Sequence, residues 1–510
     1  MEIICPYCFE KFTDDKVHFR SEKFYKDVNE VLPEGFDNVE EFTNVYNGFD
    51  KKDILEKIEK AEFFKESEDE KYEKFWEDFN GTTEEDASDE YFGIKSYHRK
   101  VIDPENKDDQ KFLWKDENAK FLIKDNDGMV SKIKLRDGEI CDRRVCPHCH
   151  NPLPTEYGKT DVKFVTIIGI SGAGKTVYIS QLLKRMSQYA AKVGLTAMVN
   201  TPSVKAFLEK NEVTANKPLP SSTETKRLQQ PLFYEIISST GGNSRKTDTL
   251  VLYDVAGEVF NDERFVEKIA PFIKHSDGLI TLIDPNQFEN IAQLNGENQL
   301  VNPTKVFEAI HNVVSQRAGD KCKKPVAVCL SKVDSEAVQQ SLNSDLQDIL
   351  LNELEGVRDE KGLCRPVFNA SQYNKLGEEL SRFITSNQQD LALVMNNNYV
   401  SFTYFAFTSL GCLVQKTDDG MIPVGPILPK RIEEPLLWLT YRFGYIDSTE
   451  PVYESDRIDV LCPKCDSSKC VKKLSEVKEG KHFFKKVMCD CYCKNCMIYF
   501  DSNGGGWCRG

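Results

Sequence analysis

The chain has 510 residues, 40% of them hydrophobic and 29% charged, which is typical of a globular protein with several domains. Its formal net charge of -15 opposes non-specific binding to nucleic acid or to anionic membranes. No apolar run approaches the ~20 residues of a membrane span, and the first residues do not resemble a signal peptide. We therefore expect a cytoplasmic protein whose 17 cysteines are metal ligands or buried thiols, because disulfides are rare in that compartment.

The chain opens with a C-P-Y-C motif at residues 5–8, and a C-P-H-C motif follows at residues 146–149. Each motif supplies half of a tetrahedral thiolate site, and neither has a nearer C-x-x-C partner. We predict that the two motifs meet and share one structural Zn²⁺. His148 and His150 are alternative ligands, and two unrelated or redox-active pairs are the alternative interpretation. The predicted ligands are Cys5, Cys8, Cys146 and Cys149.

Residues 9–145 form an insertion between the two cysteine motifs, and we expect a small α/β structure there. Residues 53–64 carry apolar side chains at helical spacing among Glu and Lys, which predicts an amphipathic helix with a solvated charged face. Residues 82–90 have loop composition. Residues 110–140 predict short strands around a D-N-D-G turn at 125–128. The sequence assigns no chemistry to the insertion.

The stretch G-I-S-G-A-G-K-T at residues 169–176 fits the phosphate-binding loop pattern G-x-x-x-x-G-K-[ST] at every fixed position. It lies between a strand-like run at 163–168 and a helical pattern at 177–186. Glycines let successive backbone N–H groups point at phosphates, and the helix N-terminus adds positive potential. We expect Lys175 to neutralise the β- and γ-phosphates as a catalytic residue, and the Thr176 hydroxyl to bind Mg²⁺. The predicted phosphate-binding residues are Gly169, Ser171, Gly172, Ala173, Gly174, Lys175 and Thr176.

From about 160 to 445, strand and helix patterns alternate, which predicts a mostly parallel sheet with helices on both faces. The predicted strands are 163–168, 231–237, 249–253, 278–283, 325–330 and 399–407. Residues 187–222 have the character of a long connection, and residues 335–398 predict a helical insertion. Residues 423–429, rich in proline, predict a stiff linker before a last helix at 433–444.

A second motif, D-V-A-G-E at residues 254–258, ends the apolar strand that starts near residue 249. Asp254 can hold Mg²⁺ through a water molecule, and Gly257 lets a backbone N–H approach the γ-phosphate. We expect Glu258 either to orient the attacking water or to slow hydrolysis by its charge. A threonine of the loop before 231–237 is expected on Mg²⁺ as well. Thr223 is the favoured catalytic and metal-binding candidate, and Thr225 is its alternative.

The strand at 325–330 ends in S-K-V-D, and this pattern resembles the purine-reading loop of Ras-like GTPases. A carboxylate at Asp334 accepts two hydrogen bonds from guanine, and adenine offers no such donor pair. The resemblance further implies that Lys332 packs on the base and that Ser331 ties this loop to the phosphate loop. The T-S-L-G stretch at 408–411 is similar to the loop that contacts guanine O6, which adds Ser409 and Leu410 to the nucleotide site.

The last segment, from about 456, carries C-P-K-C and C-K-N-C motifs in a zinc-ribbon arrangement. The favoured ligands of this second structural Zn²⁺ are Cys462, Cys465, Cys493 and Cys496. Four other cysteines are alternative ligands or form another site: Cys470, Cys489, Cys491 and Cys508. The segment is locally rich in lysine, so nucleic acid is an alternative partner for it.

Residues 160–445 resemble a translation-factor-class, Ras-like P-loop GTPase, because the motifs follow one another in the family's order. The two N-terminal cysteine motifs and the closing E-P-L-L-W-L are similar to the bacterial double-GTPase family of conflict and defence systems. This resemblance implies a Mg²⁺-dependent GTP-hydrolysing switch that binds GTP and GDP and acts with a second GTPase or an effector from a neighbouring gene. Glu258 departs from the usual Gln, and Ser331 from the usual Asn.

Two other functions are compatible with these residues. One is a nucleotide-gated zinc-ribbon scaffold with little hydrolysis, and the other is an ATPase. The predicted domains are a split zinc module at 1–158, a P-loop GTPase domain at 159–450 and a C-terminal zinc ribbon at 451–510.

Overall fold

The structure is a computed structural model, in which the chain divides into two compact units. It describes residues 1–81, 96–115, 121–170, 172–198, 202–220, 228–239, 245–295, 302–315, 319–351, 367–418, 420–446, 462–464, 471–482, 485–493, 496, 498–502 and 507–509. The first unit consists of Met1–Val162 with Asn200–Ala206 and Lys226–Phe233. The second unit consists of Lys163–Val199, Phe207–Thr225 and Tyr234–Gly510. No helix among the described residues is long and apolar enough to cross a membrane.

The first unit contains short antiparallel sheets and a set of helices. Its elements are β1 (Glu2–Ile4), β2 (Lys11–Thr13), η1 (Asp14–Lys16), β3 (His18–Arg20), η2 (Val28–Val31), α1 (Val39–Val45), α2 (Lys51–Phe63), α3 (Glu70–Asn80), η3 (Ser96–His98), β4 (Val101–Ile102), η4 (Asp109–Phe112), β5 (Leu122–Lys124), β6 (Val130–Lys134), β7 (Ile140–Cys141) and β8 (Arg144–Val145). The sheets have the orders β1-β2, β4-β3-β8 and β5-β6-β7. Because β3 pairs with β8, the beginning and the end of the predicted insertion lie side by side.

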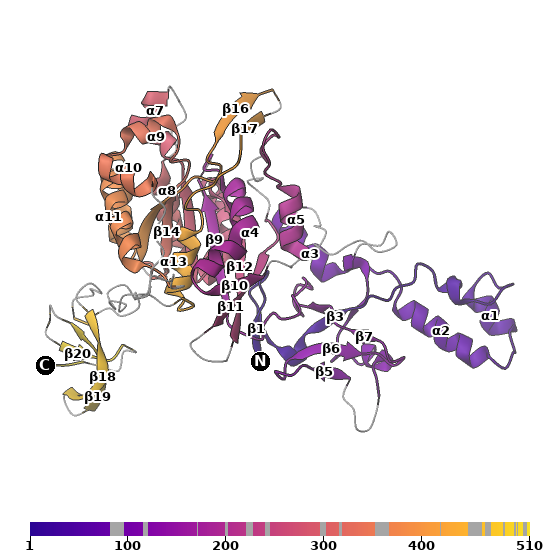
Figure 1. The fold of residues 1–510 in the computed structure, drawn as a ribbon. Helices are drawn as coiled ribbons and strands as arrows, with labels where there is room; N and C mark the ends of the chain where they lie inside the picture. The colour runs from indigo at the N-terminus through magenta and orange to yellow at the C-terminus, as the bar shows by residue number, and fades with distance from the viewer. Residues whose placement is uncertain are drawn as a thin grey trace, which may run out of the picture. The chain divides into compact units, whose positions relative to one another are not determined.

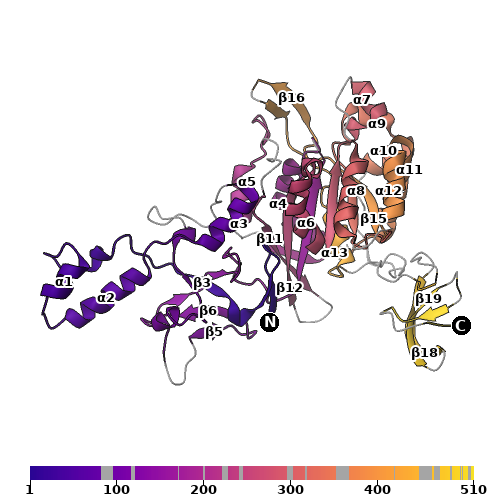
Figure 2. The ribbon, with the colours of Figure 1, turned by 180° about the vertical axis from the view of Figure 1, so that it is seen from behind.

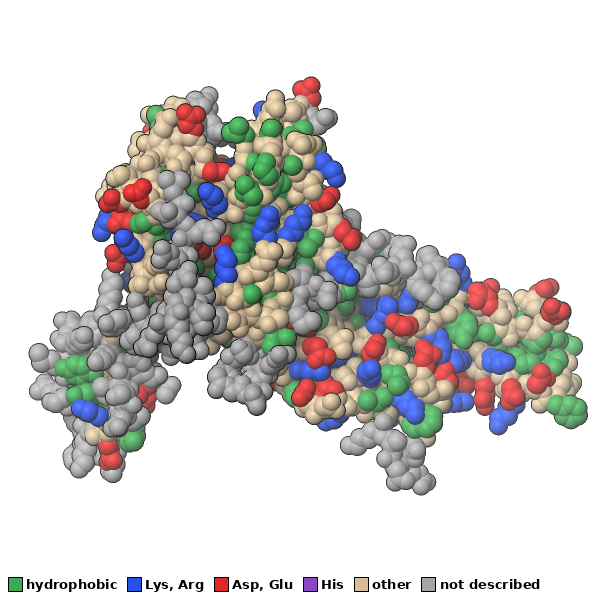
Figure 3. Space-filling view, in the orientation of Figure 1, with side chains coloured by type: hydrophobic (Ala, Val, Ile, Leu, Met, Phe, Trp, Pro, Cys, Tyr) green, Lys and Arg blue, Asp and Glu red, His purple; other side chains and the backbone are tan. Residues whose placement is uncertain are grey.

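The helix expected at 53–64 forms as α2, and α1 lies beside it in both ribbon views (Figures 1 and 2). Ile54 and Ile58 of α2 pack with Phe42 of α1 in one apolar cluster. Their neighbours on α2 are mainly exposed Lys, Glu and Asp, and the space-filling view shows both signs of charge interspersed over this part of the molecule (Figure 3). The strands expected within 110–140 form as β5, β6 and β7. The predicted loop at 82–90 lies outside the described residues.

The chain from β9 to α13 is built on a seven-stranded sheet. It belongs to the second unit, except for Val162, for Asn200–Ala206 with the start of α5, and for Lys226–Phe233 with the start of β11. Its elements are β9 (Val162–Gly169), α4 (Lys175–Lys192), β10 (Leu195–Met198), α5 (Pro202–Lys210), β11 (Leu232–Ser239), β12 (Arg245–Ala256), η5 (Gly257–Asn261), α6 (Glu263–His275), β13 (Gly278–Ile283), η6 (Pro285–Gln287), α7 (Glu289–Asn295), α8 (Pro303–Val314), β14 (Val326–Leu330), α9 (Glu336–Ser341), α10 (Ser344–Leu351), α11 (Ala370–Asn387), α12 (Gln389–Asn398), β15 (Phe402–Ala406), β16 (Leu413–Thr417), β17 (Gly420–Val424) and α13 (Glu434–Arg442). The strand order is β10-β11-β12-β9-β13-β14-β15.

The predicted α/β architecture is confirmed. Strands β9, β13, β14 and β15 pair in parallel, whereas β10 runs antiparallel to β11. Helices cover both faces. The Thr166 hydroxyl of β9 donates to the Phe272 carbonyl of α6, whereas a Cβ atom at Gly278 of β13 would meet Leu439 of α13. Because Gly278 pairs with Val165, and Val165 and Thr166 point to opposite faces, α6 and α13 lie on opposite faces. In Figure 1, β9 and β14 lie between α4 and α11.

Two connections differ from the expectation. The stretch from 187 holds the end of α4, then β10 and α5, rather than a bare connection. Pro423 was expected in a stiff linker but lies in β17, which pairs with β16. Proline is tolerated there because β17 is an edge strand of a two-stranded ribbon, and its missing N–H costs no central ladder bond.

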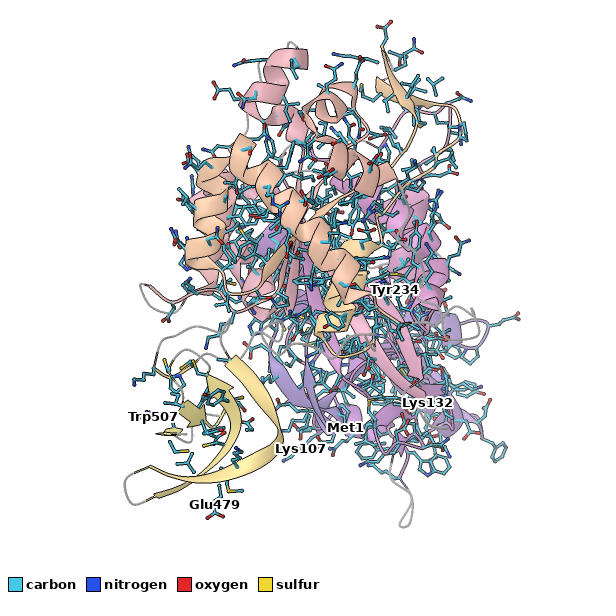
Figure 4. All side chains as sticks on the ribbon, turned by 60° about the vertical axis from the view of Figure 1, so that its left-hand side comes forward. Met1, Lys107, Lys132, Tyr234, Glu479 and Trp507 are labelled. Atoms are coloured by element: carbon cyan, nitrogen blue, oxygen red, sulfur yellow. The ribbon has the colours of Figure 1, made fainter. Side chains whose placement is uncertain are left out.

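The C-terminal residues form a separate antiparallel sheet of the order β18-β19-β20-β21. Its strands are β18 (Val471–His482), β19 (Lys485–Cys493), β20 (Ile498–Phe500) and β21 (Trp507–Arg509). Figure 4 labels Glu479 on β18 and Trp507 on β21. The apolar core of this sheet consists of Val471, Ile498 and Phe500 together with three buried cysteines, namely Cys462, Cys491 and Cys493. A sheet this small has few apolar side chains to bury, which is the usual reason for a metal in such a domain.

Candidate functional site

The phosphate loop lies between β9, which ends at Gly169, and α4, which begins at Lys175. Gly172 and Gly174 have φ angles of 76° and 73°, in the left-handed region that favours glycine. The Ala173 N–H donates to the Ile170 carbonyl at 2.9 Å and closes the turn. The loop therefore has the curled backbone that the sequence pattern predicts, directly before a helix of 18 residues.

Lys175 and Asp254 meet inside this site. The Lys175 ammonium group forms an ion pair with Asp254 Oδ1, and both side chains are buried. Asp254 lies near the end of β12, and its second carboxylate oxygen, Oδ2, is buried without a hydrogen-bond partner in the described part of the chain. Thr176 follows Lys175 in the first turn of α4 and is half-buried. A lysine and a carboxylate at the end of a phosphate loop can hold phosphate charge and a hydrated Mg²⁺ together.

Gly257 packs directly on the start of the phosphate loop. A Cβ atom at this position would lie 2.5 Å from the Gly169 carbonyl oxygen and 3.0 Å from the Ile170 Cα atom. Only glycine allows this close approach of two backbones. Glu258 follows at once in η5 and is half-buried. The D-V-A-G-E motif thus reaches the phosphate loop, and its predicted roles at Mg²⁺ and at the γ-phosphate stay predictions.

The S-K-V-D loop follows β14 and reaches the phosphate loop from another strand. Ser331 is buried, and its N–H and hydroxyl both donate to the Ile283 carbonyl, at 2.8 and 3.2 Å. Lys332 has a φ angle of 52°, a strained conformation for a residue with a side chain. A Cβ atom at Gly174 would find Lys332 Cε as its nearest neighbour, at 3.8 Å. The lysine stem therefore lies over the phosphate loop.

Sequence reasoning missed Asp284, which follows β13. Its buried carboxylate pairs with Lys332 Nζ at 2.7 Å and accepts from the Asn286 backbone and side chain, at 3.0 and 2.8 Å. Gln287, three residues on, lies beside the phosphate loop: a Cβ atom at Gly172 would be 2.8 Å from its Nε2 atom. The available signal was an aspartate directly after an apolar parallel strand, because such strand ends gather at one edge of the sheet.

Asp334 is exposed, and its loop lies beside the T-S-L-G loop. The Val333 N–H donates to the Phe407 carbonyl at 3.4 Å. Burial, and then the charge of Asp334, raises the pKa of the Cys412 thiol, which lies just beyond the T-S-L-G loop. Ser409 and Leu410 are half-buried in that loop, and the Leu410 carbonyl accepts from the Leu428 N–H at 2.7 Å. An exposed carboxylate between two loops is placed to meet a base from solvent.

Several predicted site residues cannot be placed. The following lie outside the described residues: Ser171 of the phosphate loop, both loop threonines (Thr223 and Thr225), and Cys465 and Cys470 of the C-terminal segment. Their predicted roles stay predictions. The other predicted nucleotide-site residues lie at the carboxyl ends of β9, β12, β14 and β15 or in the segments that follow these strands directly. This is the edge where open α/β sheets bind ligands.

The two N-terminal cysteine motifs meet, as predicted. The sulfur atoms of Cys5, Cys8, Cys146 and Cys149 all lie within 4.8 Å of one another. Between the motifs, Cys5 and Cys149 are 3.6 Å apart and Cys8 and Cys146 are 3.8 Å apart. Four sulfur ligands at about 2.3 Å around a tetrahedral Zn²⁺ have a similar spacing, about 3.8 Å. The donor set therefore fits zinc. The two motifs lie together although residues 9–145 separate them in the sequence, as the prediction of an insertion requires.

The two motifs have the same backbone geometry. Phe9 and His150, each directly after the second cysteine of its motif, have φ angles of 59° and 52°. Their N–H groups donate to the carbonyls of Cys5 and Cys146, at 3.1 and 2.9 Å. His150 Nδ1 contacts Asp69 at 2.7 Å, so this ring has another partner than the cysteine cluster.

The electrostatics of the N-terminal cluster also favour a bound cation. In each motif a backbone N–H points at the first cysteine: Tyr7 N lies 3.4 Å from the Cys5 sulfur and His148 N lies 3.4 Å from the Cys146 sulfur. Burial raises the pKa of the Cys5 and Cys149 thiols well above the usual range, whereas the hydrogen bond with Cys146 lowers the pKa of the Cys8 thiol. Buried thiols of this kind need a cation to lose their protons at neutral pH.

The C-terminal segment has a second cluster, in which the sulfurs of Cys462, Cys493 and Cys496 lie within 4.8 Å of one another. The Cys496 N–H lies 3.4 Å from the Cys493 sulfur, as in the N-terminal motifs. Cys489 and Cys508 form a separate buried pair, with their sulfurs 3.6 Å apart. Cys491 is buried in the core of the sheet. Three of the four favoured ligands thus come together among the described residues, and they also fit zinc.

Residues 163–361 match the family model described as DO-GTPase2, Double-GTPase 2. This segment contains the phosphate loop, the D-V-A-G-E motif and the S-K-V-D loop, so the predicted resemblance to double-GTPases is confirmed there. The chain is also 25% identical to SaeC of Mycolicibacterium smegmatis, a protein named for ESX-1 scaffolding and assembly. That match runs over 323 residues, 59% of this chain and 80% of the relative.

Solved structures give weaker likenesses. The Arl6 BBS3 small GTPase of Trypanosoma brucei with bound GppNp is 13% identical, with a TM-score of 0.23, and the match covers 55% of this chain and 96% of that one. A structure of sup35 complexed with GMPPNP is 11% identical, with a TM-score of 0.20, and the match covers 49% of this chain and 38% of that one. TM-scores this low add nothing to what the geometry indicates about the site.

Proposed function

We propose that the chain is a Mg²⁺-dependent GTPase that switches between GTP-bound and GDP-bound forms and holds two structural zinc ions. One observation carries the proposal: three motifs that are far apart in the sequence meet at one loop. Asp254 pairs with Lys175, Gly257 packs on Gly169, and the Lys332 stem lies over Gly174. Generic phosphate binding needs only the first of these contacts, whereas the S-K-V-D loop adds a means of reading the base.

In this proposal each part of the site has one task. The backbone N–H groups of the loop and Lys175 bind the phosphates, Thr176 and Asp254 hold Mg²⁺, and Asp334 binds guanine. Magnesium supplies charge neutralisation at the transferring phosphate when it is bound. Glu258, half-buried next to Gly257, is placed to act on the attacking water. Loss of the γ-phosphate removes the contact at Gly257. The segment that begins at Gly257 is then free to change conformation, and this change is the switch.

We also propose that the switch works in the cytoplasm of a bacterium, in a conflict or defence system, together with a protein partner. The resemblance to double-GTPases supports a second GTPase or an effector as that partner. The name of the Mycolicibacterium relative, which refers to scaffolding and assembly, agrees with a role in protein complexes.

The base-reading residue gives the sharpest test. Asp334→Asn should lower GTP affinity by about 100-fold or more and raise affinity for xanthosine triphosphate, because the carboxamide reverses one hydrogen bond to the base. Asp390→Asn, an exposed aspartate at the start of α12, is the matched control and should change neither affinity. Affinities of both variants for GTP, ATP and xanthosine triphosphate are measured by titration calorimetry. Unchanged GTP preference in Asp334→Asn, or tighter binding of ATP by the wild type, would reject the guanine assignment.

The phosphate-binding residue tests hydrolysis. Lys175→Met keeps most of the buried stem and removes the charge, so GTP turnover should fall by about 100-fold or more. Zinc content and circular dichroism of the variant check that it is folded. Phosphate release at saturating GTP is the measurement, and turnover within a few-fold of wild type contradicts the proposal.

A further inference from the structure

The first unit holds a short segment that belongs by sequence to the nucleotide-binding region. Lys226–Phe233 is part of this unit, whereas the chain from Tyr234 onward is part of the second unit. Leu228, Leu232 and Phe233 are all buried. Residues 228–233 of this segment, which we call the stem, run into β11 and follow the predicted loop of Thr223 in the sequence. Figure 4 labels Tyr234, the first residue of the strand beyond the stem.

An asparagine at the end of α3 binds the backbone of the stem. The Leu228 N–H donates to Asn80 Oδ1 at 2.8 Å, and Asn80 Nδ2 donates to the Leu228 carbonyl at 3.5 Å. One carboxamide therefore satisfies both backbone groups of one residue, in the manner of a strand partner. Such a bond pair fixes the position of the main chain without depending on the identity of its side chain.

The other end of the stem packs on the N-terminal cysteine motif. The Phe233 ring lies 6.3 Å from the Tyr7 ring and 5.9 Å from the Tyr157 ring, between centroids. Tyr7 lies inside the C-P-Y-C motif, and its own N–H points at the Cys5 sulfur. The Tyr157 hydroxyl donates to the Ile4 carbonyl at 2.7 Å, next to the same motif. Phe233 is thus in contact with the turn that a zinc ion would hold.

Helix α3 is tied to the other cysteine motif. The indole N–H of Trp76 donates to Asn151 Oδ1 at 2.9 Å, and both residues are fully buried. Lys71 Nζ donates to the Pro147 carbonyl at 2.8 Å. The Tyr7 ring meets the Trp76 ring at 6.2 Å, which joins the two motifs through α3. The four-cysteine cluster, α3, Asn80 and the stem therefore form one continuous set of contacts inside the first unit.

We propose that the zinc-binding first unit is the regulatory anchor of the GTPase switch: through Asn80 and Tyr7 it holds the 228–233 stem and so sets the relative affinity for GTP and GDP. This inference rests on the proposed function. In the proposed function, the loop of Thr223 binds Mg²⁺ when GTP is bound and releases it with GDP. The stem follows this loop in the sequence, so the anchor fixes the position of its C-terminal end. Any difference in how the anchor holds the stem in the two states changes the two affinities unequally. By linkage, the bound nucleotide then shifts, by the same factor, the equilibrium between the two ways in which the first unit holds the stem. A partner that binds one of these two forms would respond to the nucleotide.

Hydrogen exchange tests the anchor itself, with the full-length zinc-loaded protein. Asn80→Ala and Tyr7→Leu should each speed amide exchange in residues 228–239 by about tenfold or more. Asn29→Ala is the control, since Asn29 also lies at a short helix of the first unit and, within the described part of the chain, bonds Asp27 and Leu32 rather than the stem. Asn80→Asp keeps the acceptor for the Leu228 N–H and should restore part of the protection. Exchange in 228–239 that is the same in Asn80→Ala, Tyr7→Leu and wild type overturns the anchor.

Nucleotide affinity tests the regulation. In Asn80→Ala the ratio of the affinities for a non-hydrolysable GTP analogue and for GDP should change by about fivefold or more, the lower range of allosteric coupling. Asn80→Asp should lie between this variant and wild type, and Asn29→Ala should match wild type. A ratio unchanged within twofold in Asn80→Ala, in a protein whose stem exchanges faster, shows a merely structural contact and overturns the regulatory role. Wild-type protein that binds no guanine nucleotide instead rejects the proposed function, and the exchange result is read separately.

Discussion

The two cysteine centres of this chain have the same chemistry and very different surroundings. The N-terminal centre joins motifs whose contacting cysteines are 138 residues apart, as in Cys8 and Cys146. The C-terminal centre joins motifs that lie close together in the sequence, on a small sheet whose core is itself rich in cysteine. The first centre is packed against α3 and, through Tyr7, against the 228–233 stem. Among the described residues, the second centre packs with the apolar side chains of its own sheet.

Loop length alone does not explain the difference. Closing a loop of 138 residues rather than one of about 30 raises the free-energy cost of loop closure by only about 1.3 kcal/mol, because this cost grows with the logarithm of the length. What differs is how much structure depends on each centre. C-x-x-C motifs of the same type can therefore stabilise one small sheet or a whole unit, depending on which side chains pack on them.

The largest effect is expected from removing one ligand of each centre. Cys146→Ala should lose one zinc ion and unfold the first unit, because zinc binding contributes about 10–16 kcal/mol in small zinc domains and whole-domain stabilities are only about 5–15 kcal/mol. Cys493→Ala should also lose one zinc ion but disturb only the C-terminal sheet. Zinc stoichiometry and limited proteolysis of both variants are the measurements. Equal protease resistance of the first unit in the two variants would remove the distinction between the centres.

An intermediate effect is expected from paired tryptophan substitutions. Trp76→Phe leaves the buried Asn151 Oδ1 atom without the indole N–H donor, which should cost about 1–3 kcal/mol of unfolding free energy. Trp507→Phe, on the half-exposed ribbon, should cost less than about 1 kcal/mol, because water replaces lost contacts there. Urea midpoints followed by far-ultraviolet circular dichroism give both values. The reverse order would mean that α3 does not support the cysteine cluster as its contacts indicate.

The smallest effect separates ligand cysteines from core cysteines in the ribbon. Cys508→Ser removes the partner of Cys489 and should leave the zinc content at two per chain, with a modest loss of stability of about 1 kcal/mol. Cys496→Ser, within the C-terminal cluster, is the matched variant and should reduce the content to one. Metal analysis of both purified proteins is the measurement. One zinc per chain in Cys508→Ser would make the Cys489 and Cys508 pair part of a metal site.

The sequence marks the parts of the candidate nucleotide site because each part is a short contiguous pattern. The phosphate loop needs eight successive residues, and the spacing of apolar residues on either side of it predicts the strand and the helix. Gly257 packs on Gly169 and the Lys332 stem lies near Gly174, whereas their roles toward a nucleotide stay predictions. Asp284 was not predicted, since an aspartate after a strand has many uses, and its pairing with Lys332 depends on how neighbouring strands are ordered in the sheet.

By itself, the sequence determined the local chemistry of this protein: a curled glycine loop, cysteine pairs that can grip a metal, and strands and helices in alternation. Only the tertiary structure decided which distant pieces share a surface. Asn80, Leu228 and Phe233 belong to no motif. The contacts of Asn80 with Leu228 and of Tyr7 with Phe233 depend on how α3, the cysteine turns and the stem pack together. Local patterns record the preferences of adjacent residues, whereas such a meeting depends on the sum of many weak contacts between segments that are remote along the chain.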